Sequence, residues 1–314
     1  MRIFKRQYSW AVTFGIALTA FILYVLLDAF VIPRSYIVLD NNLPETTAST
    51  TAGASSGSET QMTEETTTNE IVITDSYYND GNICITITTY RAYDTDIYVA
   101  DITLLSAEYL QTAFAENTYG KNITEKTSDI ADENDAILAI NGDYYGTRSG
   151  YVIRNGILYR SKSAGTDQED LVIYADGRFE VILEGDVTAA ELLEAGAVQV
   201  LSFGPALITD GVISVSANDE VDKAMTSNPR TAIGIIDALH YVMAVTDGRT
   251  SASEGLSLYE LAQFMQTLGV DTAYNLDGGG SSTMYFCGVV VNNPTTNGKT
   301  IAERSVSDIV YIGY

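Results

Sequence analysis

The chain has 314 residues, 46% of them hydrophobic, and a formal net charge of −24 at pH 7. This length allows one large domain or two small ones with a sizeable core, and the acidic balance argues against nucleic acid as a partner, because phosphate binding needs a basic face. A single histidine, His240, cannot supply a histidine-based metal site, and two cysteines, Cys84 and Cys287, are too few for a disulfide framework. One bridge between these cysteines stays open.

The first feature along the chain is an apolar run at residues 10–32, which is long enough to cross a bilayer as a helix. Arg2, Lys5 and Arg6 precede it and Arg34 follows it, a distribution that keeps the N-terminus in the cytoplasm. The alternative is a cleaved signal peptide, whose apolar region would be shorter and would end in a small-x-small site. We therefore expect an uncleaved single-pass anchor in the cell membrane, with the C-terminal part outside the cell.

The segment after the apolar run is rich in Thr, Ser, Glu and Ala and has little that could pack. Such composition is typical of a disordered stalk. The sequence thus predicts a cytoplasmic tail at 1–9, a transmembrane anchor at 10–32, a linker at 33–70 and an outer domain at 71–314.

The outer domain shows mainly strand patterns. Residues 83–90 alternate apolar and polar side chains, and 96–105 form a second strand-like run. Residues 106–120 are predicted to form a helix that ends at a glycine. The further strands are expected at about 136–140, 230–236, 241–246, 271–276, 283–291 and 307–312.

Local signals place helix starts and turns between these strands. Thr188 with Glu191, and Ser257 with Glu260, have the spacing of capping boxes and predict two helices. Hairpin turns are expected at Asn155-Gly156, Asp176-Gly177 and Asp210-Gly211. Many strands with few helices predict an α/β (α+β) domain that has a mixed β-sheet core and flanking helices.

Polar clusters that contain or adjoin glycine border many of the apolar runs, and one of them is the most informative. A single cluster of this kind is usually a hairpin turn. In Asp277-Gly278-Gly279-Gly280-Ser281-Ser282, however, three glycines free successive N–H groups to form an anion-binding nest, to which the serine hydroxyls add donors. The cluster is neither a Walker loop nor a dinucleotide-binding turn, because it lacks the spacing of both. It predicts an anionic ligand.

Six motifs follow one another along the chain. They are Asn141-Gly142-Asp143, Phe203-Gly204-Pro205, Pro229-Arg230-Thr231, Asp247-Gly248-Arg249, Asp277 to Ser282, and Glu303-Arg304. In this order they resemble the phosphodiester glycosidase family over roughly residues 139–312, most specifically at Asp-Gly-Gly-Gly-Ser and the upstream Asp-Gly-Arg. The resemblance implies a hydrolase that cleaves a sugar-1-phosphodiester, such as an N-acetylglucosamine phosphodiester, at its glycosidic C–O bond.

The residues of these motifs suit that chemistry. The leaving group is a phosphate monoester with a last pKa of about 6, so the need for a general acid is small. What is needed is neutralisation of the phosphate charge and a carboxylate beside an oxocarbenium-like centre. The candidate catalytic residues are Asp277, Glu303 and Asp143. The candidate substrate-binding residues are Asn141, Arg230, Thr231, Asp247, Arg249, Gly278, Gly279, Gly280, Ser281, Ser282 and Arg304.

Cofactor and partner stay open at this level. Asn141, Asp143, Asp247, Asn275 and Asp277 carry the hard oxygen donors that Ca²⁺ or Mg²⁺ prefers, although no loop has a recognised ligand spacing. The expected partner is a phosphorylated glycan or a cell-surface polymer, as in exopolysaccharide or cell-wall metabolism. The alternatives are a non-catalytic glycan-binding or polymer-attachment protein that uses the same pocket, and a phosphodiesterase that cuts the P–O bond.

Overall fold

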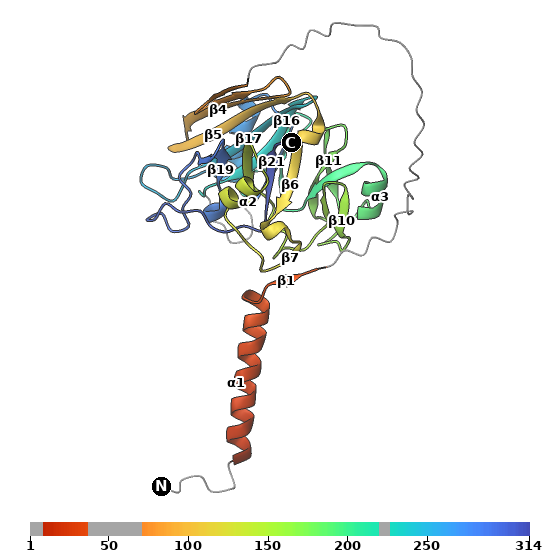
Figure 1. Ribbon diagram of the computed structural model, residues 1–314, viewed down its shortest axis with the longest axis vertical. Helices are drawn as coiled ribbons and strands as arrows, with labels where there is room; N and C mark the ends of the chain where they lie inside the picture. The colour runs from red at the N-terminus through yellow and green to blue at the C-terminus, as the bar shows by residue number, and fades with distance from the viewer. Residues whose placement is uncertain (1–8, 37–70, 220–226) are drawn as a thin grey trace, which may run out of the picture.

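The computed structural model describes residues 9–36, 71–219 and 227–314. Helix α1 (Ser9–Phe30) stands apart from a sheet-rich domain and is largely exposed (Figure 1). Its segment Trp10–Phe30 has a mean hydropathy of 2.2 and is long and apolar enough to cross a membrane, a test that a signal sequence would also pass. Most of the predicted tail and linker lies outside the described residues.

The largest described sheet has nine strands, each antiparallel to its neighbours, in the order β15-β14-β18-β16-β17-β5-β4-β3-β2. The strands are β2 (Val72–Thr74), β3 (Tyr77–Asn79), β4 (Ile83–Ala92), β5 (Thr95–Leu104), β14 (Ala206–Thr209), β15 (Val212–Ile213), β16 (Thr231–Asp237), β17 (His240–Thr246) and β18 (Thr272–Asn275). Its central strands bury both faces, since Ile233 and Met243 pack in one apolar cluster and Ala232 and Val242 in another.

A different layer covers each face of this sheet. Helix α4 (Leu258–Thr267) packs its apolar stripe on one face. The other face meets a five-stranded sheet of order β20-β19-β8-β21-β6, and α2 (Thr127–Glu133) covers the far side of that sheet. Its strands are β6 (Leu110–Phe114), β8 (Leu138–Asn141), β19 (Met284–Phe286), β20 (Val289–Val290) and β21 (Asp308–Ile312).

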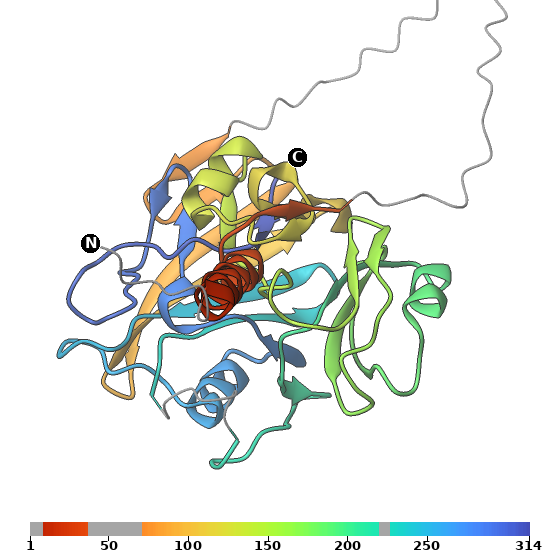
Figure 2. The ribbon, with the colours of Figure 1, turned by 90° about the horizontal axis from the view of Figure 1, so that it is seen from below.

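A second five-stranded sheet, of order β10-β9-β13-β11-β12, lies at the side of the domain with α3 (Ala189–Glu194) packed on it (Figure 2). Its strands are β9 (Val152–Arg154), β10 (Ile157–Arg160), β11 (Glu169–Tyr174), β12 (Phe179–Leu183) and β13 (Ala197–Leu201). The predicted fold class, a mixed sheet-rich core with few helices, is confirmed.

The local predictions of caps and turns are confirmed, and one helix prediction is wrong. Both capping boxes are present, and the three predicted hairpin turns join β9 to β10, β11 to β12 and β14 to β15. The helix predicted at 106–120 is wrong. Strand β6 occupies this segment between two single-turn 3₁₀ helices, because its residues pair with β21 along their whole length. Cys84 and Cys287 are both free thiols.

The chain directly after α1 packs on the domain. Strand β1 (Arg34–Ser35) pairs with β7 (Gly120–Lys121), and the Tyr36 N–H donates to the Tyr119 carbonyl at 2.9 Å. Gly120 is needed for this contact, because a Cβ there would lie 2.0 Å from the Arg34 carbonyl oxygen.

Candidate active site

The polar motifs converge because of the strand order. Strand β16 runs antiparallel to both β17 and β18, so its start lies beside the ends of those two strands. A cavity of about 190 Å³ opens there. Its lining consists of Phe203, Asn228, Arg230, Arg249, Asn275, Leu276, Asp277, Gly278, Gly279 and Arg304.

Asp277 is the only acidic residue in the lining that the structure describes, and it is 8% exposed. Its Oδ2 accepts a hydrogen bond from Arg304 Nη2 at 3.0 Å. Burial raises the pKa of the Asp277 carboxyl above its ordinary value, while the charge of Arg304 and hydrogen bonds from Ser281 and the Gly278 N–H oppose that rise. The site therefore holds a partly desolvated carboxyl group beside a guanidinium.

Three arginines surround the same cavity. Arg304 is held by Ser281, whose hydroxyl oxygen accepts from Nε at 2.9 Å, and Arg230 Nε donates to the Leu256 carbonyl at 2.8 Å. Arg249 Nε and Nη2 donate to Asn228 Oδ1 at 3.2 and 3.0 Å. Burial lowers the pKa of Arg249, and the positive charges of Arg304 and Arg230 lower it further. Guanidinium groups gathered in this way are suited to bind a phosphate.

The three glycines after Asp277 are required by close packing. A Cβ on Gly278 would lie 2.9 Å from the Pro229 carbonyl oxygen, and a Cβ on Gly280 would lie 2.3 Å from Thr296 Oγ1. Gly279 has a φ of +62°, and its missing Cβ leaves room for Arg249 Nη2. The glycines thus let the walls of the cavity approach one another.

The same loop uses several of its N–H groups internally. Gly279 donates to the Pro229 carbonyl at 2.8 Å, and Ser281 and Ser282 donate to the carbonyls of Gly278 and Gly279 at 3.3 Å. These three groups are therefore not offered to a ligand as the predicted nest requires. The guanidinium groups are the positively charged donors in the lining.

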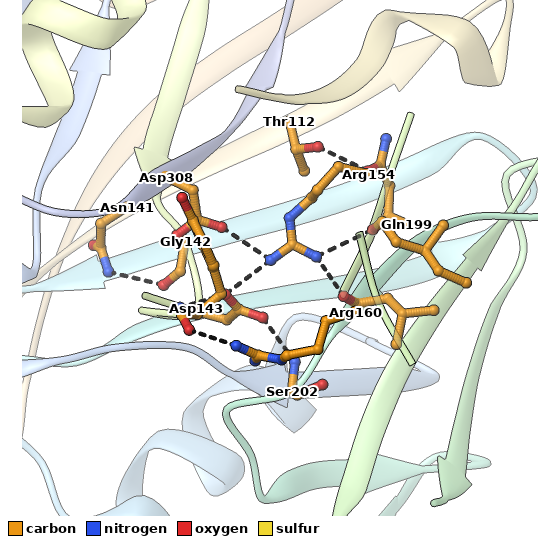
Figure 3. Close-up of polar contacts among 12 residues, drawn as sticks. Thr112, Asn141, Gly142, Asp143, Arg154, Arg160, Gln199, Ser202 and Asp308 are labelled. Carbon is orange, nitrogen blue, oxygen red and sulfur yellow. Dashed lines mark hydrogen bonds and ion pairs between the residues drawn. The ribbon is translucent and has the colours of Figure 1, made fainter. Parts of the chain in front are cut away.

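Asp143 lies elsewhere, in a buried ionic cluster (Figure 3). Arg154 Nη2 contacts Asp143 Oδ1 at 2.8 Å and Asp308 Oδ2 at 3.0 Å, and all three side chains are at most 2% exposed. The Ser202 N–H donates to Asp143 Oδ2 at 2.8 Å. Gly142 is required here, because its Cβ would lie 2.5 Å from the Asp308 carboxyl group. The structure does not bring Asp143 to the cavity.

Glu303 also points away from the cavity, although its neighbour Arg304 lines it. The Ser128 N–H and hydroxyl donate to the two Glu303 carboxylate oxygens at 3.0 and 2.6 Å, at the start of α2. Glu303 therefore ties the chain before β21 to α2 rather than facing the site.

Three further predicted residues, Asn141, Thr231 and Asp247, lie outside the cavity lining and form hydrogen bonds next to it. Asn141 Nδ2 donates to the Asp277 carbonyl at 2.6 Å, and its Oδ1 accepts from the Thr231 hydroxyl at 2.8 Å. Asp247 accepts from the N–H and side-chain amide of Asn293 at 2.8 and 2.9 Å. These contacts fix the backbone around Asp277 and the loop after β20, and none of the three residues is in the lining.

A divalent cation has no convergent donor set here. Within residues 9–36, 71–219 and 227–314, no three His, Cys, Asp or Glu side chains gather in a way that could hold a metal. The carboxylates suggested from sequence have different partners, since Asp143 binds Arg154, Asp247 binds Asn293 and Asp277 binds Arg304. These residues do not fit a metal site, and we assign no step to one.

The structure adds residues that sequence reasoning left out of the site. Phe203 and Asn228 line the cavity. Phe203 belongs to a recognised motif and Asn228 directly precedes another, so these motifs were the available signal. The guanidinium of Arg148 stacks on the Phe203 ring at 4.1 Å. Arg154 stands in no motif, and nothing in the sequence marked it.

Comparison with known proteins identifies the family. A family model described as phosphodiester glycosidase matches residues 134–313. The chain belongs to this family. The resemblance of its motifs, and with it the assignment to a family of hydrolases, is confirmed.

Individual relatives agree with this assignment. A prophage-derived uncharacterized protein of Bacillus subtilis, YomE, is 29% identical over 62% of this chain and 31% of its own length. The human N-acetylglucosamine-1-phosphodiester alpha-N-acetylglucosaminidase is 30% identical over 57% of this chain and 38% of its own length. The chain thus spans about a third of the length of these relatives.

A solved structure shows the same fold. The catalytic domain of the zebrafish N-acetylglucosamine-1-phosphodiester alpha-N-acetylglucosaminidase, auto-inhibited by its pro-peptide, superimposes with a TM-score of 0.59 at 23% identity. The match covers 74% of this chain and 83% of the zebrafish domain.

Proposed function

We propose that this protein hydrolyses a sugar-1-phosphodiester at the glycosidic C–O bond and releases a free sugar and a phosphate monoester. One observation carries the proposal: a single partly desolvated carboxyl group, Asp277, shares a cavity with Arg230, Arg249 and Arg304. Membership of the phosphodiester glycosidase family supports it.

The arrangement suits the demands of this reaction. The guanidinium groups neutralise charge on the departing phosphate, where such stabilisation lowers the barrier most. Because a phosphate monoester leaves without strong protonation, one carboxylate can suffice. Asp277 would act on the anomeric carbon, either as a nucleophile whose glycosyl ester water then hydrolyses, or as the base that takes a proton from the attacking water.

The substrate class follows from the relatives. The human relative is named for N-acetylglucosamine-1-phosphodiesters, so we propose an α-linked N-acetylglucosamine phosphodiester as the first candidate. We further propose that α1 anchors the protein in the cell membrane and that the domain acts outside the cell on a phosphorylated surface glycan, such as an exopolysaccharide or cell-wall polymer.

The test uses the full-length protein in detergent and a methyl phosphodiester of α-N-acetylglucosamine. Wild type should release free sugar, and Asp277→Asn should lower kcat/KM by about 10²–10⁴-fold. Asp271→Asn, which changes an exposed acid just before the same strand β18, should leave the rate unchanged. Full activity of Asp277→Asn would contradict the assigned role, and saturable binding without product would favour a glycan-binding protein.

The position of bond cleavage is tested in ¹⁸O-water. Cleavage of the C–O bond places the label in the released sugar. Label in the phosphate would instead indicate a phosphodiesterase that cuts the P–O bond.

A further inference from the structure

Asn275, the last residue of β18, has a side chain whose orientation the protein fixes. The residue is 1% exposed, and its backbone N–H donates to the Pro205 carbonyl at 3.2 Å. Its Nδ2 donates to the Gly204 carbonyl at 2.8 Å. Because that carbonyl accepts only, the amide nitrogen must face it and the amide oxygen must point the other way.

The amide oxygen of Asn275 has no hydrogen-bond partner among the residues that the structure describes. A buried polar atom of this kind is costly, and native proteins keep few of them. Asn141, the last residue of β8, is an instructive contrast. It is equally buried, yet its Oδ1 accepts from Thr231 and its Nδ2 donates to the Asp277 carbonyl. The fold can therefore give both polar atoms of a buried asparagine side chain a hydrogen-bond partner at a strand end. At Asn275 only the amide nitrogen has one among the residues that the structure describes.

Asn275 lines the cavity of the proposed active site, where its chemistry differs from that of the arginines. Guanidinium groups donate only and so suit phosphate oxygens. An amide oxygen accepts only, so it repels an ionised phosphate oxygen and takes an O–H or an N–H. The lining thus combines guanidinium donors, which suit an anion, with one residue whose unpaired amide oxygen suits a neutral group that carries a donor.

The position of Asn275 indicates which part of the substrate meets this acceptor. Asn275 and Asp277 are two residues apart in the chain and line the same cavity, which puts Asn275 close to Asp277. Asp277 faces the anomeric carbon in the proposed reaction. The nearest donor on the sugar is then the substituent on the adjacent carbon, C2.

We propose that Asn275 Oδ1 accepts a hydrogen bond from the C2 substituent of the substrate sugar, an acetamido N–H or a hydroxyl, and selects against sugars that lack this donor. This inference rests on the proposed function and names the substrate class. Asn275 acts as a binding residue that sets specificity, next to Asp277 at the reacting carbon.

The test compares two substrates on each enzyme, the methyl phosphodiesters of α-N-acetylglucosamine and of 2-deoxyglucose. For each enzyme, kcat/KM for the N-acetylglucosamine substrate is divided by kcat/KM for the 2-deoxyglucose substrate. Dividing the wild-type ratio by the Asn275→Ala ratio then cancels the intrinsic reactivity of the two substrates and any loss of folded protein. We expect this quotient to be about 5–150, as for a buried acceptor deprived of its donor. In Asn141→Ala, the matched control, the substrate ratio should equal that of wild type. A quotient near one for Asn275→Ala would overturn the inference.

A second measurement needs no variant. N-acetylglucosamine should inhibit wild type at a concentration at least about 5-fold lower than 2-deoxyglucose does, again from one buried hydrogen bond. Equal inhibition constants would overturn the inference while leaving the hydrolase intact. If wild type hydrolyses neither phosphodiester, the proposed N-acetylglucosamine substrate is excluded, and the specificity inference falls with it.

Discussion

Two aspartate–arginine clusters of this domain have nearly the same contact geometry and different surroundings. In the cavity cluster, Asp277 and Arg304 lie 3.0 Å apart and the Arg304 side chain is 41% exposed. In the buried cluster, Arg154 lies 2.8 Å from Asp143 and 3.0 Å from Asp308, and no side chain exceeds 2% exposure. A pair of opposite charges therefore says little about function until its access to solvent is known.

The buried cluster is also part of a larger closed network. Ser202 links it to a second pair of acids through Tyr151. The Ser202 N–H donates to Asp143 and its hydroxyl donates to the Tyr151 carbonyl at 2.8 Å, while the Tyr151 N–H donates to Glu184, whose charge acts on Asp170. The cavity cluster instead faces a space of about 190 Å³ with two more arginines around it. We expect the closed network to govern stability and the cavity cluster to govern activity.

The largest expected effect is on the closed network. Arg154→Met would leave Asp143 and Asp308 as buried carboxyl groups without their cation, which should lower the free energy of unfolding by about 3–5 kcal/mol. Arg304→Met removes a guanidinium that is partly in solvent and should cost about 1 kcal/mol or less. Urea unfolding of both variants and wild type measures the difference. Equal losses would contradict the distinction between the clusters.

The next largest effect is on activity. Arg304→Gln should lower kcat/KM by about 100-fold, because it removes one charge that stabilises the departing phosphate. It should also move the acid limb of the pH–rate profile. Arg304 lowers the pKa of Asp277, so its removal raises that pKa, and the ionised carboxylate then persists only at higher pH.

A pH–rate profile of kcat/KM for wild type and Arg304→Gln checks this shift. Arg178→Gln, which removes an exposed guanidinium that pairs with Glu180, is the control and should leave the limb in place. A limb that moves to lower pH in Arg304→Gln would exclude Asp277 as the group that must be ionised.

A further effect, on the pH dependence of stability, also distinguishes the closed network from the cavity cluster. Burial, and then the charge of Glu184, raise the pKa of Asp170 to about 9. The folded protein therefore keeps a proton that the unfolded chain, with a pKa near 3.9, releases. Stability must fall as pH rises between these values, by at most about 1.4 kcal/mol per pH unit.

Asp170→Asn should remove this slope, because an amide has no proton to lose. Denaturant unfolding at pH 5 and pH 8 measures it, with Asp167→Asn, an exposed neighbour, as the control. If the difference in unfolding free energy between wild type and Asp170→Asn is the same at pH 5 and pH 8, Asp170 does not keep its proton.

Local signals in the sequence were enough for much of the fold. The capping box at Ser257 and the turn at Asn155-Gly156 depend on residues a few positions apart, and both are present. The segment 106–120 has helical character by itself, but its partner β21 lies almost two hundred residues further along the chain. A pairing over that distance leaves no local pattern.

The same limit applies to the site. Residues of the glycine-containing motifs at strand ends form much of the cavity lining, because strand order brings those ends together. They did not distinguish Asp277, which lines the cavity, from Asp143, which meets Arg154 in the core, or from Glu303, which meets Ser128. Each distinction depends on a partner from a distant segment.

Glu303→Gln gives the smallest expected effect and the closest check of this point. Glu303 precedes a residue of the cavity cluster, yet its oxygens accept from Ser128 at the start of α2. We expect kcat/KM to stay within about 3-fold of wild type, and stability to fall by about 1 kcal/mol as a charged helix cap becomes neutral. A loss comparable to that of Asp277→Asn would mean that Glu303 leaves Ser128 and enters the cavity when substrate binds, and the site would then contain the second carboxylate that glycosidases commonly use.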